Sequence, residues 1–157
     1  MGLNIAGLIF NKKIDNQQLE DLFNNKLEYA KDTDFDEATS SFRDENTIDV
    51  LQTEYGTFVI IEMGEVHDLT NIHSEIVQFI VSDVSDTYYF EKYSNGKLER
   101  KFISSQGEIA DNFGEGILNE DDDLEDKVWE FIDNYLQINF TEIMFDLKFR
   151  QYKIKQR

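Results

Sequence analysis

Acidic residues at alternate positions form the first segment whose chemistry could hold a ligand. Asp32, Asp34 and Asp36 are separated by single residues, as are the acids at the start of an EF-hand calcium loop. Such a loop needs glycine at its sixth position and a bidentate glutamate at its twelfth, and this chain has Glu37 and Arg43 there. We therefore interpret the segment as a solvated acidic loop and expect neither a specific metal nor a cofactor.

The two histidines, His67 and His73, are the other side chains that could do chemistry. Their separation of six residues matches no metal-ligand motif, and HExxH is absent. Ser74 follows His73, but a catalytic triad is defined by geometry rather than by adjacency in the chain. The sequence Gly114-Glu115-Gly116 lacks a third glycine and has an acid where a phosphate would approach. We therefore predict that the protein is not an enzyme.

The charge balance limits the classes of partner. The chain has 33 acidic and 15 basic residues, no cysteine, and a net charge of −18. Residues 148–157 contain five bases and no acid, which leaves residues 1–147 with 10 bases, 33 acids and a net charge of −23. Such a body repels nucleic acid and anionic lipid and attracts cationic proteins. The simpler alternative is that the acids only keep the protein soluble.

Two runs of acids are the predicted partner surface, because opposed electrostatic potentials give specificity and fast association. We expect a basic protein to bind at eight residues: Asp32, Asp34, Asp36, Glu37, Glu120, Asp121, Asp122 and Asp123.

The element with the clearest sequence signature is a hairpin over residues 87–105. Asn95-Gly96 is typical of a two-residue type I′ turn, and the flanking aromatic and β-branched residues favour strands. We attribute the aromatics to sheet packing, because nucleic-acid stacking platforms lie in basic grooves. The predicted register pairs Ser94 with Lys97, Tyr93 with Leu98, Lys92 with Glu99, Glu91 with Arg100, Phe90 with Lys101, Tyr89 with Phe102 and Tyr88 with Ile103.

The other elements follow from hydrophobic periodicity. Asp15 and Gln18 form a predicted capping box for a helix that ends near Asn25, and residues 124–136 carry a second apolar helical stripe. A last short helix is expected at residues 140–147, a strand with a long acidic loop at 28–45, and a glycine-containing loop at 107–116. Further strands are expected at residues 5–10, 47–53, 57–63, 75–81 and 148–154.

This order predicts a single α+β domain over residues 1–157. We expect a mainly antiparallel sheet with two principal helices packed against it. No apolar run approaches the roughly 20 residues of a membrane span, and the apolar residues 5–10 are too few for a signal-peptide core. We therefore expect a cytoplasmic protein that does not contact membranes.

Several short motifs carry a resemblance: residues 1–7, Asn95-Gly96-Lys97-Leu98, Gly107-Glu108, Gly114-Glu115-Gly116 and the acidic run that leads into an aromatic helix. With these, the chain resembles a group of small, uncharacterised bacterial cytosolic proteins. Its layout is also similar to that of immunity proteins encoded beside polymorphic bacterial toxins. The resemblance implies an acidic single domain that masks a basic toxin surface, and it assigns no role to any individual residue.

Three hypotheses for function follow from the sequence. The leading one is a non-enzymatic acidic protein-binding module of the immunity type. The second is a small-molecule binding protein or hydrolase with a pocket between helix and sheet that contains His67 or His73. The third is a scaffold whose basic segment, residues 148–157, folds onto the acidic body or onto another copy. Neither the partner nor the oligomeric state is defined by the sequence.

Overall fold

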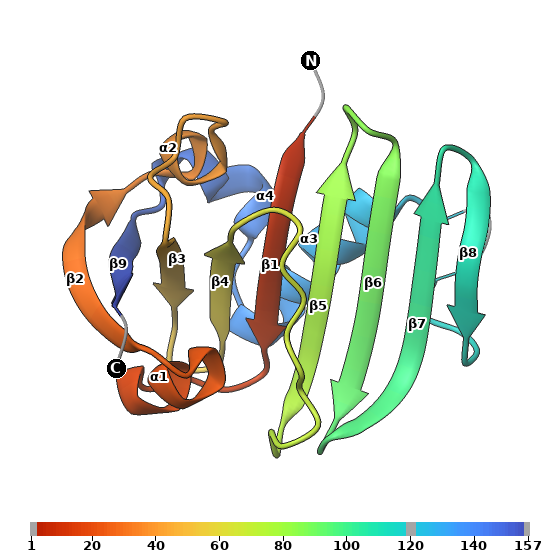
Figure 1. The fold of residues 1–157 in the computed structure, drawn as a ribbon, viewed down its shortest axis with the longest axis horizontal. Coiled ribbons are helices and arrows are strands. Elements are labelled where there is room, and N and C mark those ends of the chain that lie inside the picture. Colours follow the sequence, from red (N-terminus) through yellow and green to blue (C-terminus); the bar gives the residue numbers. More distant parts are fainter. Residues whose placement is uncertain (1–2, 119–121, 156–157) are drawn as a thin grey trace.

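The computed structural model describes residues 3–118 and 122–155 of the chain. Within these residues, one antiparallel nine-stranded sheet forms the body of the protein, in the order β2-β9-β3-β4-β1-β5-β6-β7-β8 (Figure 1). The strands are β1 (Asn4–Phe10), β2 (Lys26–Thr33), β3 (Thr47–Gln52), β4 (Thr57–Ile61), β5 (Glu75–Ser82), β6 (Thr87–Ser94), β7 (Lys97–Ser105), β8 (Glu108–Phe113) and β9 (Phe149–Lys155).

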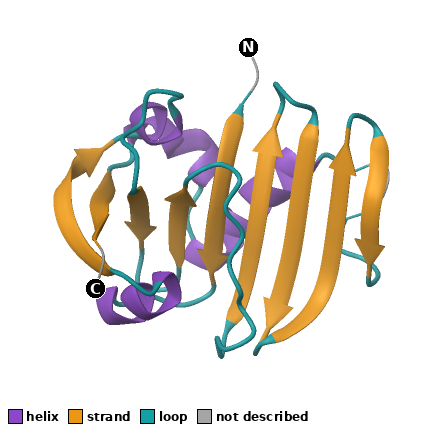
Figure 2. Ribbon diagram, viewed as in Figure 1, coloured by secondary structure: helices purple, strands orange, loops and turns teal. Residues whose placement is uncertain are grey.

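The helices are minor elements, as Figure 2 shows by the extent of strand over helix. The described part of the chain contains α1 (Asn16–Phe23), α2 (Phe35–Thr39), α3 (Leu124–Leu136), α4 (Phe140–Ile143) and the 3₁₀ turn η1 (Met144–Asp146). Of these, α3 alone is longer than eight residues. The predicted α+β fold with two principal helices is therefore wrong, and the protein is mostly a nine-stranded antiparallel sheet.

The sheet is larger than predicted partly because the segment 107–116, predicted as a loop, contains the strand β8. The strand with a long acidic loop predicted at 28–45 corresponds to β2, which begins at Lys26 and is followed by the short α2. These strands are the two edges of the sheet. All six residues of β8 are exposed, and in β2 only Thr33 is buried. Strands without a buried face lack the alternation of apolar and polar residues that identifies a strand.

The predicted hairpin turn is confirmed. Asn95 and Gly96 have φ values of 51° and 81°, as a type I′ turn requires, and Ser94–Lys97 and Tyr93–Leu98 pair as expected. A bulge then leaves Glu99 without a partner strand residue. Beyond it every predicted pair is wrong by one residue, so that the observed pairs are Lys92–Arg100, Glu91–Lys101, Phe90–Phe102, Tyr89–Ile103 and Tyr88–Ser104.

The bulge has a packing reason. With the shifted register, Phe90 and Phe102 are opposite each other and belong to the same apolar cluster. Arg100 is then buried, with 4% of its surface exposed, beneath the segment that follows β8. The extra residue, Glu99, therefore allows both the pairing of two aromatic side chains and the burial of the Arg100 guanidinium.

Both faces of the central strands are covered. Behind the sheet in Figure 1, α3 packs its buried residues against an apolar cluster that includes Phe58 and Phe79. On the other face, Leu19 and Phe23 of α1 pack with Leu8 of β1. All five residues of β4 are buried, as expected from its continuous apolar run. The capping box is also confirmed, since Asp15 accepts from the Gln18 backbone N–H at 2.8 Å and Gln18 Oε1 accepts from the Asp15 N–H at 3.0 Å.

The basic C-terminal segment is part of the sheet. As predicted, residues after Lys148 form a last strand, and β9 lies between β2 and β3 rather than at an edge. Lys155 forms an ion pair with Glu28 at 2.8 Å, and the Arg150 guanidinium lies 4.6 Å from the centre of the Tyr29 ring. In the described residues, no helix is long and apolar enough to cross a bilayer.

Candidate functional site

A groove of about 860 Å³ crosses the end of the sheet where β1 begins, beside α2 and the turn between β5 and β6. We call it the end groove. It is lined by Leu3, Asn4, Ile5, Ala6, Asp36, Ala38, Thr39, Ser40, Ser41, Arg43, Ile60, Ile61, Met63, Ser82 and Val84.

The groove presents apolar side chains to solvent. Val84 is 77% exposed and Met63 is 44% exposed, and both line the groove. Exposed apolar groups with a polar rim are typical of protein interaction surfaces. The groove therefore has the composition of a contact surface for another protein.

The first predicted acidic cluster lies at one side of this groove, on and before α2. Asp34 caps the helix by accepting from the Glu37 backbone N–H at 2.8 Å. Glu37 forms an ion pair with Lys31 at 2.8 Å, and Asp32 accepts from the Tyr29 hydroxyl at 2.8 Å. Asp36 alone of the four lines the groove, and its carboxylate has no partner within the described residues. Three of the four predicted acids therefore have structural partners, and Asp36 is the one that faces the groove.

The second predicted cluster lies where α3 begins. Glu120 and Asp121 are outside the described residues. Asp123 caps α3, accepting from the Asp126 backbone N–H at 3.3 Å, and together with Asp122 it lines a cavity of about 260 Å³. Glu125 lines the same cavity, and burial raises the pKa of its carboxyl, with neighbouring carboxylates adding to the effect. This cavity therefore concentrates negative charge.

Asp83, in the turn between β5 and β6, connects the two clusters. It lines the second cavity, and the next residue, Val84, lines the end groove. Its carboxylate accepts from the Leu3 backbone N–H at 2.9 Å and from the Tyr88 hydroxyl at 3.0 Å. Burial, followed by this hydrogen bond, raises the pKa of Tyr88 to about 12. Asp83 cannot be recognised in the sequence, because a single acid in a short polar turn has no distinguishing pattern.

The described acids of both clusters thus lie at one end of the sheet, although about 90 residues separate them in the sequence. We call the set that lines the two cavities the acidic rim: Asp36, Asp83, Asp122, Asp123 and Glu125.

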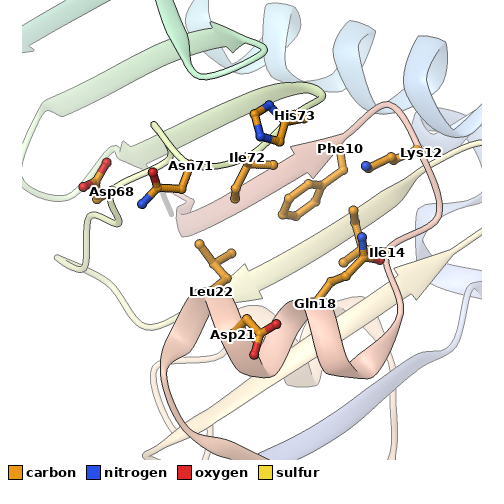
Figure 3. Close-up of a pocket in the computed structure, with 10 residues that line it drawn as sticks. All are labelled: Phe10, Lys12, Ile14, Gln18, Asp21, Leu22, Asp68, Asn71, Ile72 and His73. Carbon is orange, nitrogen blue, oxygen red and sulfur yellow. The ribbon is translucent and has the colours of Figure 1, made fainter.

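A second site lies at the other end of β1, between α1 and the segment that precedes β5 (Figure 3). This α1 pocket has a volume of about 380 Å³. It is lined by Phe10, Lys12, Ile14, Gln18, Asp21, Leu22, Asp68, Asn71, Ile72 and His73. His73 therefore lines a pocket between helix and sheet, whereas the two carboxylates of the pocket, Asp21 and Asp68, are exposed rather than buried.

His67 has a different environment. Its ring contacts Phe23 edge-on, with the ring centres 4.9 Å apart, and its Nε2 lies 3.5 Å from Glu65 Oε2. Burial lowers the pKa of His67, and the charge of Glu65 opposes this effect. The Ser74 hydroxyl is buried and forms no hydrogen bond with His73. The described histidines and Ser74 are therefore not arranged as a nucleophile and base.

Two buried carboxylates do not themselves line the cavities described above. Asp49 forms an ion pair with Arg43 at 2.7 Å and accepts from the Thr33 hydroxyl at 2.9 Å. Glu91 accepts from the hydroxyls of Tyr89 and Tyr93 at 2.7 Å and 3.1 Å. Both are satisfied by their neighbours, as buried charges must be. In the part of the chain that the structure describes, no three acidic or histidine side chains converge to hold a metal ion.

Comparison with known proteins gave no match: no protein-family model, no curated protein and no solved structure is significantly similar to the chain. The candidate sites rest on the geometry and charge of this protein.

Proposed function

We propose that the protein is a non-enzymatic module that binds a basic protein at the end groove, as an immunity-type inhibitor would bind a basic toxin. The observation that carries the proposal is the position of the acidic rim. Asp36 lines a groove with exposed apolar side chains, and the other acids of the rim, from segments far apart in the sequence, line the cavity next to it.

The two parts of this surface have different roles. The acidic rim attracts a cationic partner and orients it, and electrostatic steering of this kind raises association rates by roughly 10–10³. The apolar groove around Val84 and Met63 supplies contact area that is removed from water on binding. The matching partner surface has lysine or arginine side chains around an apolar centre.

Repulsion within the acidic rim supports a cationic partner. The carboxylates of Asp83 and Asp123 contribute to the raised pKa of Glu125, so these groups repel one another in the free protein. An arginine or lysine from a partner placed between them relieves this repulsion. Binding is therefore expected to lower the pKa of Glu125.

The test uses the product of the neighbouring gene as the first candidate partner. Calorimetry at low and high salt measures its affinity for the protein and for two charge-neutralised variants, Asp36→Asn and Glu125→Gln. We expect a higher Kd at high salt and in both variants. Glu54→Gln is the matched control, because Glu54 is an exposed acid in the turn between β3 and β4, away from the groove.

The apolar part of the surface is tested separately with Val84→Ser, for which Ile109→Ser on β8 is the control. Ile109 is 49% exposed and does not line the groove. We expect Val84→Ser to weaken binding without changing its dependence on salt. An affinity that responds neither to salt nor to any groove variant contradicts the proposal.

A further inference from the structure

The α1 pocket combines an apolar floor with a polar rim (Figure 3). Phe10 and Ile14 are buried, with 1% and 3% of their surfaces exposed, and Leu22 and Ile72 are partly buried around them. The volume of about 380 Å³ lies within the range of about 300–1,000 Å³ that is usual for small-molecule sites. The pocket therefore has the size and the apolar floor for a small organic ligand.

The hydrogen-bond acceptors on the rim are already engaged within the protein. Asp21 accepts from the Gln17 side chain at 3.0 Å. Asp68 accepts from the backbone N–H and hydroxyl of Thr70 at 3.0 Å and 2.7 Å, and these bonds lower the pKa of its carboxyl. Both carboxylates are exposed to water, and each already accepts a hydrogen bond within the protein.

The basic side chains on the rim, unlike the two carboxylates, have no partner within the described chain. Lys12 is half-buried, yet within residues 3–118 and 122–155 its ammonium group has no ion pair or hydrogen bond. The His73 side chain likewise has no partner in the described chain. Other lysines of the described chain also lack an ion pair, namely Lys13, Lys26, Lys97, Lys148 and Lys153, but all of them are exposed, so Lys12 differs from them by its burial. In Figure 3 Lys12 and His73 lie above the Phe10 ring, and Asp21 lies below it.

We propose that the α1 pocket binds a small amphipathic carboxylate. The apolar body of the ligand lies on Phe10, Ile14, Leu22 and Ile72, and its carboxylate accepts hydrogen bonds from Lys12 and His73. A singly charged group is favoured over a phosphate dianion, because each added negative charge is repelled by the net charge of −18. The site is independent of the proposed function, since it lies at the opposite end of β1 from the end groove.

The experiment compares phenylacetate with phenylacetamide, a neutral compound of nearly the same shape, by NMR titration of the full chain. We expect both compounds to shift the amide signals of the pocket, with phenylacetate binding about tenfold more tightly, as for a charge-assisted hydrogen bond. Signals around Val84 should not move. Shifts located elsewhere, equal affinities of the two compounds, or no binding of phenylacetate would overturn the proposal.

Variants identify the charged partner. Lys12→Met keeps the length of the side chain but removes its charge, and it should abolish the preference for phenylacetate. Lys13→Met is the matched control, because Lys13 is exposed and does not line the pocket. His73→Asn, at an exposed position, should weaken phenylacetate binding and provides a second test if Lys12→Met does not fold. If one folded variant keeps the full preference for phenylacetate over phenylacetamide, the residue changed in it does not bind the carboxylate. If both variants keep this preference, the proposal is refuted.

Discussion

Two parts of the sheet, the half around β1 and β4 and the half that ends at β8, are held together by different interactions. In β4, near the centre, all five residues are buried, and β1 beside it is buried from Ile5 onward. In β8, at one edge, all six residues are exposed, and in β7 only Arg100 is buried. Helix α3 packs behind β1, β4 and β5, so the apolar cover diminishes toward β8.

Among the described residues, the thinly covered half contains three buried charged side chains instead, and one of them, Lys92, forms ion pairs with Glu75 and Glu99. Glu91, 4% exposed, accepts from Tyr89, Tyr93 and the Gln78 amide. Arg100, also 4% exposed, donates to the Asn112 side chain and to the carbonyl oxygens of Lys101, Phe113, Gly116 and Leu118. Within the described chain, Glu91 and Arg100 form no ion pair, so neutral groups satisfy these two charges.

The comparison shows how a sheet can extend beyond its apolar core. A guanidinium has five N–H donors in a fixed plane, and here they connect β7 to β8 and to the segment that follows it. Directional hydrogen bonds therefore replace apolar burial where no helix covers the strands. Substitutions in the two halves should differ in size and in how far their effects spread.

The largest expected effect is in the covered half. Phe58 is fully buried and contacts Phe79, Phe140 and Phe149. Phe58→Ala should lower the free energy of unfolding by about 3–5 kcal/mol, measured by urea denaturation, because it leaves a cavity in the core. Phe113→Ala on β8, where the ring is 52% exposed, should change it by less than about 1 kcal/mol. Similar losses in both variants would remove the distinction between the halves.

The next effect is at Arg100. Arg100→Met removes all five donors and leaves their acceptors unpaired, which should cost about 2–3 kcal/mol. Hydrogen exchange should show that the β8 amides exchange faster in Arg100→Met than in wild type. The exchange rates of the β4 amides should change only by as much as the loss of global stability predicts. Arg100→Lys keeps the charge with fewer, less directional donors and should lie between wild type and Arg100→Met. A uniform change across the sheet would contradict a local role.

The same contrast explains which parts of the fold the sequence predicted. Central strands, the capping box of Asp15 and Gln18, and the Asn95-Gly96 turn depend on local residue type or on burial of both faces. The edge strands β2 and β8 are exposed, so their sequences lack alternation. The bulge at Glu99 depends on Arg100 reaching a segment about 15 residues later, which local patterns do not encode.

The candidate sites, like the edge strands and the bulge, depend on contacts between distant segments. Acidic runs were evident in the sequence, but most of the described members cap helices or form local bonds. Asp83 joins the rim only because β5 lies beside β1 and because α3 begins near the turn after β5. Lys12 is not distinguished in the sequence, because its burial without a partner is a three-dimensional property. Pairings between distant segments therefore decide the sites, and one sequence without its fold does not define them.

A smaller effect is expected at the buried carboxylate of the thinly covered half. Glu91→Gln keeps the shape of the side chain but removes its charge and replaces one acceptor oxygen with an NH2 donor, so one tyrosine hydroxyl can no longer donate to it. The free energy of unfolding should fall by about 1–2 kcal/mol in urea denaturation. Glu108→Gln, at an exposed position of β8, is the control and should have no measurable effect. An equal or greater stability of Glu91→Gln would show that Glu91 does not stabilise this half.

The smallest expected change in the free energy of unfolding at neutral pH is at Tyr93. Tyr93→Phe removes one hydrogen bond to Glu91 and should cost about 0.5–1.5 kcal/mol. Burial, followed by the charge of Glu91, raises the pKa of Tyr93 from 10.0 to about 12. The folded protein therefore disfavours the phenolate, and the resulting stability is present below pH 10 and is lost as the pH rises toward 12. Wild type should lose stability over this interval more steeply than Tyr93→Phe, in urea denaturation at successive pH values. Tyr55→Phe is the control, because its side chain is 50% exposed, and its loss of stability with pH should match that of wild type. If the stability of Tyr93→Phe also falls with pH as steeply as that of wild type, the hydrogen bonds around Glu91 are open to water. Polar bonding would then not replace burial in this half of the sheet.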